Sequence, residues 1–184
     1  MATKKSSPNR AERRKQARNR KRLGIIMLVI AIPIAIGLIL FSMPPKSPQK
    51  PSGPQFTKEG VLSFVDQETG TNIRTIDIEV KDNDYERAEG MMWRKSMEDT
   101  QGMLFIMEGL EPRSFWMRNT YIPLDIIFVD ENNAIVNIRE NAPPQTLDPQ
   151  TSTGPAKYVV EVIGGFCAQF GISAGDRIDF KIDQ

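Results

Sequence analysis

Residues 115–130 read FWMRNTYIPLDIIFVD, and this stretch decides how the second half of the chain folds. Pro123 has no N–H to donate to a β-ladder, and it disfavours helical geometry in the residue before it. The segments on either side, 115–118 and 124–129, are rich in the aromatic and aliphatic residues typical of strands. The stretch therefore predicts two strands joined by a bend over residues 119–123.

Further strand patterns lie on both sides of this stretch. Side-chain character alternates over residues 72–80, which predicts a half-buried strand. Short apolar or alternating runs predict five more strands, at 61–65, 103–107, 134–139, 158–163 and 177–182. Residues 141–155 contain four prolines and are expected to form a loop.

Two short helices are expected among these strands. Asp82 or Asn83 is suited to cap a helix over 84–89, which Gly90 ends, and 164–170 has room for one or two helical turns. Many short strands with little helix predict a mainly β domain, β-rich α+β in class. We expect a small barrel- or sandwich-like domain with short helices, preceded by one transmembrane helix.

That transmembrane helix is predicted from an uncharged apolar run, LGIIMLVIAIPIAIGLILFSM, at positions 23–43. A helix of this length reaches roughly 30 Å, the thickness of a bilayer core. Residues 1–22 carry ten Lys or Arg and one Glu, a net charge of +9, so the N-terminus is expected in the cytoplasm. The sequence thus predicts a single-pass cell-membrane protein. Its basic tail would lie near anionic lipid headgroups, and its C-terminal domain outside the cytoplasm, in the periplasm where an outer membrane is present.

A proline-rich spacer follows the apolar run. Residues 44–55 contain five prolines and predict an extended linker to a domain over 56–184. Residues 51–184 carry twelve basic and twenty-two acidic side chains, a net charge of −10, which disfavours nucleic acid as a partner. The tail at 1–22 has no aromatic side chain among its charges, so it offers no platform for base stacking either.

Composition also excludes several kinds of chemistry. The chain has no His and one Cys, Cys167. Ser-His and Cys-His catalytic pairs are therefore excluded within the chain, as are an internal disulfide and a thiolate metal cluster. No metal-ligand spacing or glycine-rich phosphate loop is recognisable in the sequence. We expect neither a metal nor another cofactor.

Candidate ligand-binding side chains gather at the predicted bend. Asn119, Thr120 and Asp125 are short polar residues there, with Arg118 beside them and Trp116 as a possible stacking wall. Together they predict a small polar ligand site. The alternative is that Asn119 and Asp125 bond local backbone N–H groups and only shape the turn.

Arg94 is the sixth candidate. With Arg118 it could bind a carboxylate or phosphate, because the guanidinium fork suits both groups. Each arginine could instead pair with an acid of the domain, such as Asp99, Asp125 or Glu161. Both alternatives stay open at the level of sequence.

Several runs in the domain resemble those of a known family. They are GMMWR at 90–94, GMLF at 102–105, FWMRNT at 115–120, IPLDIIFVD at 122–130, YVVEV at 158–162, Gly171-Ile172 and Gly175-Asp176. The chain is similar in these runs to the family catalogued as DUF192, also called UPF0127. The resemblance implies a compact β-rich domain of the kind found in small exported or membrane-anchored bacterial and archaeal proteins. It implies no reaction, so no catalytic residue is carried over.

Three functions fit these observations. The leading hypothesis is a membrane-tethered binding module of the cell envelope, which would recognise a small molecule, a peptide or an envelope polymer. The second is a carboxylate-based hydrolase acting on envelope material, with an acid and base pair drawn from Glu140, Asp148 and Glu161. The third is a structural subunit of a membrane complex. The lack of a standard catalytic set favours a protein that is not an enzyme.

Overall fold

The computed structural model describes residues 53–183. Within this range no helix is long and apolar enough to cross a membrane. The predicted basic tail, transmembrane segment and most of the linker lie outside the described residues. The linker's last residues, 53–55, and the predicted domain lie within the range, apart from Gln184.

Seven strands and two short helices make up the described part of the chain. The strands are β1 (Gly60–Val65), β2 (Asn72–Lys81), β3 (Gln101–Phe115), β4 (Leu124–Val129), β5 (Ile135–Ala142), β6 (Gln150–Ile163) and β7 (Arg177–Ile182). The helices are α2 (Asp84–Glu89) and α3 (Phe166–Phe170). The prediction of a mainly β domain with short helices is therefore confirmed.

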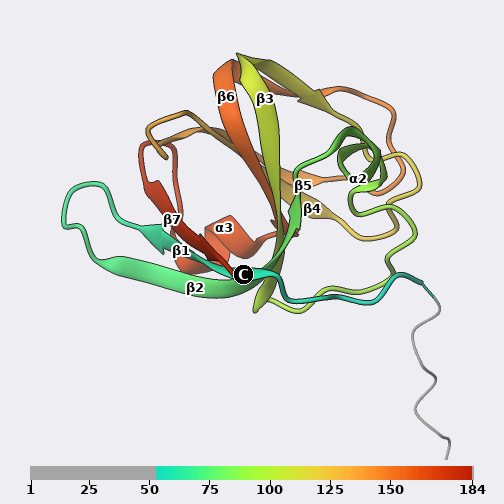
Figure 1. Cartoon of the computed structure of the whole chain (residues 1–184), viewed down its shortest axis with the longest axis horizontal. Coiled ribbons are helices and arrows are strands. Elements are labelled where there is room, and N and C mark those ends of the chain that lie inside the picture. The colour runs from blue at the N-terminus through green and yellow to red at the C-terminus, as the bar shows by residue number, and fades with distance from the viewer. Residues whose placement is uncertain (1–52, 184) are drawn as a thin grey trace, which may run out of the picture. The chain divides into compact units, whose positions relative to one another are not determined.

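The strands form one curled sheet in the order β5-β4-β6-β3-β2-β1-β7. The β2–β3 pair is parallel and the other pairs are antiparallel. A bridge between Ala134 and Arg177 connects the regions just before β5 and at the start of β7, so the two edges of the sheet meet at one end. The result is a half-barrel, with α3 on its concave side and α2 outside it (Figure 1). Of the two predicted architectures, barrel-like and sandwich-like, this half-barrel agrees with the barrel-like one.

Apolar side chains cover both faces of the central strands. The concave face packs a core around Phe64, Leu104 and Val160, and Phe166 of α3 closes it with its ring 5.6 Å from that of Phe64. The convex face packs a second core that includes Met103, Phe105 and Phe128. Because both faces are buried, neighbouring residues on one strand belong to different cores.

The short helix α2 begins and ends where the sequence predicts. Asn83 is its N-cap, and its side-chain oxygen accepts the backbone N–H of Glu86. Gly90 follows its end with φ 46°, and a Cβ there would lie 3.1 Å from the ring of Phe105. The glycine thus allows both the positive φ at the end of the helix and the close approach to the sheet.

Two local predictions are wrong. Residues 116–118 leave the sheet after β3 ends at Phe115, although a strand was expected over 115–118. The whole proline-rich segment 141–155 was expected to be loop, but its last part, from Gln150 onward, is the first half of β6. Pro155 is tolerated there because β4 pairs only with the later half of β6, from Tyr158 onward, so this half is an edge on one side.

Candidate functional site

A row of paired residues crosses the convex face of the sheet and brings two acids into it. Glu79 on β2 pairs with Met103 on β3, Met103 with Glu161 on β6, and Glu161 with Ile126 on β4. Glu161 therefore lies on an interior strand with apolar neighbours on both sides. This position removes its side chain from solvent.

The side chain of Glu161 is buried, and one of its carboxyl oxygens has no hydrogen-bond partner within residues 53–183. Its residue is 4% exposed, and its Oε2 atom has no hydrogen-bond partner among the described residues. Burial raises the pKa of Glu161 to about 8, against the opposing effect of the positive charge of Arg94. The side chain is therefore mostly an uncharged acid at neutral pH, able to donate one hydrogen bond.

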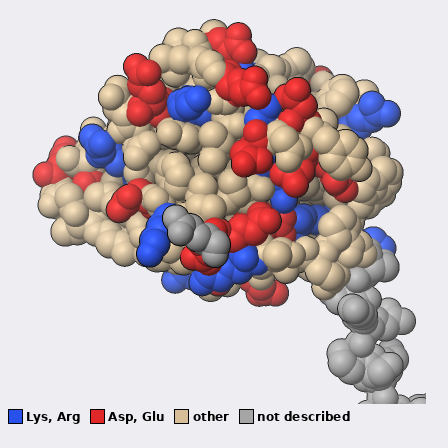
Figure 2. Space-filling view, in the orientation of Figure 1, with Lys and Arg blue, Asp and Glu red and all other residues tan. Residues whose placement is uncertain are grey.

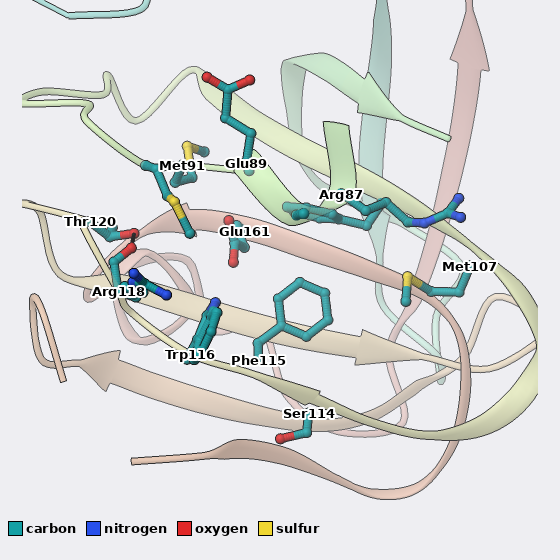
Figure 3. A pocket seen from close by; sticks show the side chains of 14 residues that line it. Arg87, Glu89, Met91, Met107, Ser114, Phe115, Trp116, Arg118, Thr120 and Glu161 are labelled. Carbon is teal, nitrogen blue, oxygen red and sulfur yellow. Dashed lines mark hydrogen bonds between the residues drawn. The ribbon is translucent and has the colours of Figure 1, made fainter. Parts of the chain in front are cut away.

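Glu161 faces a pocket of about 270 Å³ (Figure 3). Six large apolar side chains line it: Met91, Met92, Phe105, Met107, Phe115 and Trp116. Methionine adapts to irregular shapes, and the aromatic rings supply flat apolar walls. The arrangement, an apolar cavity with few polar groups, is typical of a small-molecule site.

The rim of this pocket carries a cation that has no acidic partner. Trp116 is 51% exposed, and the guanidinium carbon of Arg118 lies 5.4 Å from the centre of its ring. No carboxylate within residues 53–183 forms an ion pair with Arg118. Thr120 also lines the pocket, through a turn in which its N–H donates to the carbonyl of Met117 at 3.1 Å.

Backbone hydrogen bonds between three loops fix this rim. The N–H of Trp93 donates to the carbonyl of Asn119 at 2.8 Å, and the N–H of Gln145 donates to the carbonyl of Thr120 at 3.1 Å. The N–H of Met117 donates in turn to the carbonyl of Thr146 at 3.1 Å. Asn119 sits in the left-handed region with φ 56°, a conformation that asparagine tolerates. The wall is therefore held in place without a ligand.

Asp125 lies on the opposite face of the sheet from the pocket. It precedes Ile126 on β4, and period-two alternation turns it toward the concave side. Its buried carboxylate accepts three backbone N–H groups, from Asn141 at 2.8 Å, Gly165 at 3.0 Å and Cys167 at 2.8 Å. Asp125 thus ties β4 to the end of β5 and to the start of α3.

The structure separates the six predicted site residues into two groups. Trp116, Arg118 and Thr120 line the pocket, and Asn119 lies in the turn beside them, its amide 3.8 Å from the sulfur of Met92. The other two, Asp125 and Arg94, bond within the protein: Arg94 donates to Glu79 at 2.6 Å. Ligand binding by these residues stays a prediction.

Sequence reasoning did not assign Glu161, Met91 or Met92 to this site. Glu161 was considered as a partner for the arginines and as one of three acids for hydrolysis, and the other two, Glu140 and Asp148, are exposed and do not line the pocket. The signal was present in YVVEV, because an acid inside an apolar strand is unusual unless it is partnered.

Two further chemistries can be judged on the described residues. No group of three or more Cys, Asp or Glu side chains there is placed to hold a metal ion. The thiol of Cys167 is buried. Burial is the largest cause that raises its pKa far above the usual range, and the neighbouring negative charge of Asp125 adds to the effect. Such a thiol is not a nucleophile at neutral pH.

Comparison with known proteins places the fold. The model of the DUF192 family, described as uncharacterised, matches residues 65–180, more than half of the chain. A crystal structure of a candidate transcription regulator from Sinorhizobium meliloti 1021 is 30% identical with a TM-score of 0.64, and the match covers 69% of this chain and 98% of that one. A protein of unknown function from Novosphingobium aromaticivorans DSM 12444 is 31% identical with a TM-score of 0.63, over 74% and 99% of the two chains. No curated protein matches the chain.

Proposed function

The chain belongs to the DUF192 family, and we propose that its domain is a binding module that takes a small ligand into the Glu161 pocket. The observation that carries this proposal is the buried carboxyl group of Glu161, whose Oε2 has no hydrogen-bond partner among the described residues, at a largely apolar cavity. Trp116, Arg118 and Thr120 belong to the same site, as rim and wall.

A role in stability alone explains Glu161 poorly. A buried polar group without a hydrogen-bond partner costs about 1–3 kcal/mol of folding free energy. An apolar side chain between Met103 and Ile126 would avoid that cost. A ligand that accepts a hydrogen bond from Glu161, or offers it a positive charge, would compensate for the cost on binding.

The site also favours binding over hydrolysis. A carboxylate hydrolase needs two carboxyl groups facing the same bond, about 5–10 Å apart. Glu89 is the other acid among the lining residues, and it is exposed with its carboxyl pointing away from Glu161 (Figure 3). Glu161 has the raised pKa of a general acid, but among the described lining residues no second carboxyl group faces it as a base.

We further propose that the domain is tethered to the cell membrane on its outer side. The apolar run at 23–43, the +9 tail before it and the proline-rich spacer after it support this topology. The test uses the full chain in its host: it should stay in the membrane pellet after alkaline extraction. Protease added outside the cytoplasmic membrane should degrade the domain. Release into the soluble fraction would contradict the tether.

The binding proposal is tested with a pocket-blocking variant. Ala88 is an exposed residue of α2 that lines the pocket, so Ala88→Trp should fill the cavity without disturbing either core. Tyr85→Trp is the matched control, because Tyr85 is exposed on the same helix but does not line this pocket. A fragment set is screened by ligand-observed NMR against the full chain in detergent. Fragments should bind the wild type and the control and lose binding to Ala88→Trp; equal binding to all three proteins would refute the site.

A further inference from the structure

An acid and an arginine face the pocket and form no salt bridge in the described part of the chain. Glu161 lies at the base, and Arg118 lies at the rim against Trp116. The remaining lining arginine, Arg87, is already paired, with Asp84 at 2.6 Å and Glu108 at 3.5 Å. Glu161 is buried and Arg118 is exposed, so the two differ in depth, and Glu89, the other acid of the lining, points its carboxyl away from Glu161 (Figure 3).

We propose that the ligand is a zwitterion of free amino-acid type, with its ammonium group on Glu161, its carboxylate on Arg118 and its apolar side chain among the methionines and phenylalanines. This inference rests on the proposed binding function and names the ligand class for that pocket. The guanidinium fork suits a carboxylate, and a buried carboxylate suits an ammonium group. A volume of about 270 Å³ is at the small end of ligand sites and fits a molecule of this size.

Ligands with one charge match the site less well. A simple amine would pair with Glu161 but leave Arg118 unpaired beside another positive charge. A simple carboxylate would pair with Arg118 but leave the buried carboxyl of Glu161 without a cation. Acidic side chains gather around α2, close to the pocket (Figure 2), so the surroundings favour the ammonium end of an approaching ligand.

Proton release distinguishes ligands with an ammonium group, the zwitterion among them, from ligands without one. Glu161 is protonated before binding, because burial raises its pKa to about 8. When an ammonium group binds, the carboxyl O–H proton leaves to solvent and the carboxylate forms an ion pair with the ammonium. Binding should therefore release about one proton at pH 7 and strengthen as the pH rises to about 8.

Other charged groups lie around Glu161. Arg94 approaches it from the loop after α2 and is paired with Glu79 of β2, two strands away. On the other side, Arg139 of β5 lies beyond Ile126. Arg87, Glu89 and Arg118 line the pocket itself. Free ammonium groups of amino acids titrate above pH 8, so Glu161 supplies the proton.

The experiment compares four ligands that share an isobutyl group: leucine, 3-methylbutan-1-amine, 4-methylpentanoate and 3-methylbutan-1-ol. Their affinities for the full chain in detergent are measured by calorimetry in two buffers of different ionisation enthalpy. We expect leucine to bind about tenfold or more tightly than each analogue, and to release about one proton. In Glu161→Gln, the affinity for leucine should fall to that for 4-methylpentanoate, and leucine should bind without proton release. In Arg118→Gln, the affinity for leucine should fall to that for 3-methylbutan-1-amine, and leucine should still release a proton on binding.

The outcomes separate this inference from the proposed function. If an analogue with one charge binds as tightly as leucine, or leucine binds without proton release, the zwitterion is wrong. If none of the four binds but fragments bind the wild type and not Ala88→Trp, the binding function stands and the ligand class is wrong. If neither the four ligands nor the fragments bind, the binding function itself is wrong.

Discussion

The guanidinium of Arg94 donates to the carboxylate of Glu79, with Nη2 2.6 Å from Oε2. Both side chains are buried, at 9% and 3% exposure. The pair attaches the loop after α2 to β2, and so holds in place the segment that carries Met91 and Met92. The positive charge of Arg94 also lowers the pKa of Glu161, so one arginine serves both acids of the row.

Replacing Arg94 should therefore destabilise the domain. In Arg94→Met, the partners of Glu79 that remain among residues 53–183 are Lys81 at 3.2 Å and the N–H of Thr57 at 2.9 Å, and they compensate its buried charge less completely. We expect a loss of about 3 kcal/mol in the free energy of unfolding, measured by urea denaturation. The double variant with Glu79→Gln should recover part of this loss. A single variant within about 0.5 kcal/mol of wild type would mean that the pair is unimportant for folding.

Asp125 should prove essential to the fold and not to ligand binding. Asp125→Asn cannot accept all three of the N–H groups that the carboxylate accepts, because its amide nitrogen is a donor. We expect a loss of about 2–3 kcal/mol in thermal or urea unfolding. Asp130→Asn is the comparison: Asp130 accepts two N–H groups at a less buried turn and should cost less. At a temperature where Asp125→Asn is folded, fragment affinities should equal those of wild type; a selective loss of affinity would restore Asp125 to the site.

Asn119 should behave as a turn residue. Its φ of 56° is permitted to glycine and strained for a β-branched side chain. Asn119→Gly should thus stay within about 0.5 kcal/mol of wild type, and Asn119→Val should cost about 1–2 kcal/mol. Binding to the glycine variant separates the two roles. Unchanged fragment affinity indicates a turn residue, whereas a tenfold loss would make the side-chain amide a ligand contact.

Local sequence signals predicted those parts of this fold that depend on local physics. The α2 helix was predicted from an N-cap residue before it and a glycine after it, and in the structure Asn83 and Gly90 have these positions. The β2 strand was predicted from the alternation of polar and apolar side chains over residues 72–80. By contrast, the second half of β3 and the first half of β6 depend on each other for pairing. Pro155 makes the first half of β6 look like loop in the sequence, because proline fits a strand only at a sheet edge and the sequence does not show that this half is an edge.

The site was less predictable than the fold for a related reason. In YVVEV, alternation puts Val159 and Glu161 on one face and Val160 and Val162 on the other, but it does not say which face is buried. Here both faces are buried, so Glu161 has no exposed side to occupy. The same alternation places Asp125 and Ile126 on different faces, although they are adjacent in the chain.

The raised pKa of Glu161 predicts an unusual dependence of stability on pH. In the unfolded chain this carboxyl group titrates near its ordinary value of 4.5, and in the folded protein near 8. Between these values the folded state binds the proton more tightly, so the free energy of unfolding should fall as pH rises from about 5 to 8. The expected slope from this group is about 1.4 kcal/mol per pH unit.

Glu161→Gln should abolish that slope, because glutamine resembles the protonated acid in shape and does not titrate. The free energy of unfolding of the variant, relative to that of the wild type, should thus rise by about 1.4 kcal/mol per pH unit across this range. Urea denaturation of both proteins at pH 5, 6, 7 and 8 measures this difference. Glu89→Gln is the control: this exposed acid is also close to the pocket, but its replacement should leave the slope unchanged. A wild-type slope that persists in Glu161→Gln would mean that another group titrates. It would also remove the reason to expect proton release when a ligand binds.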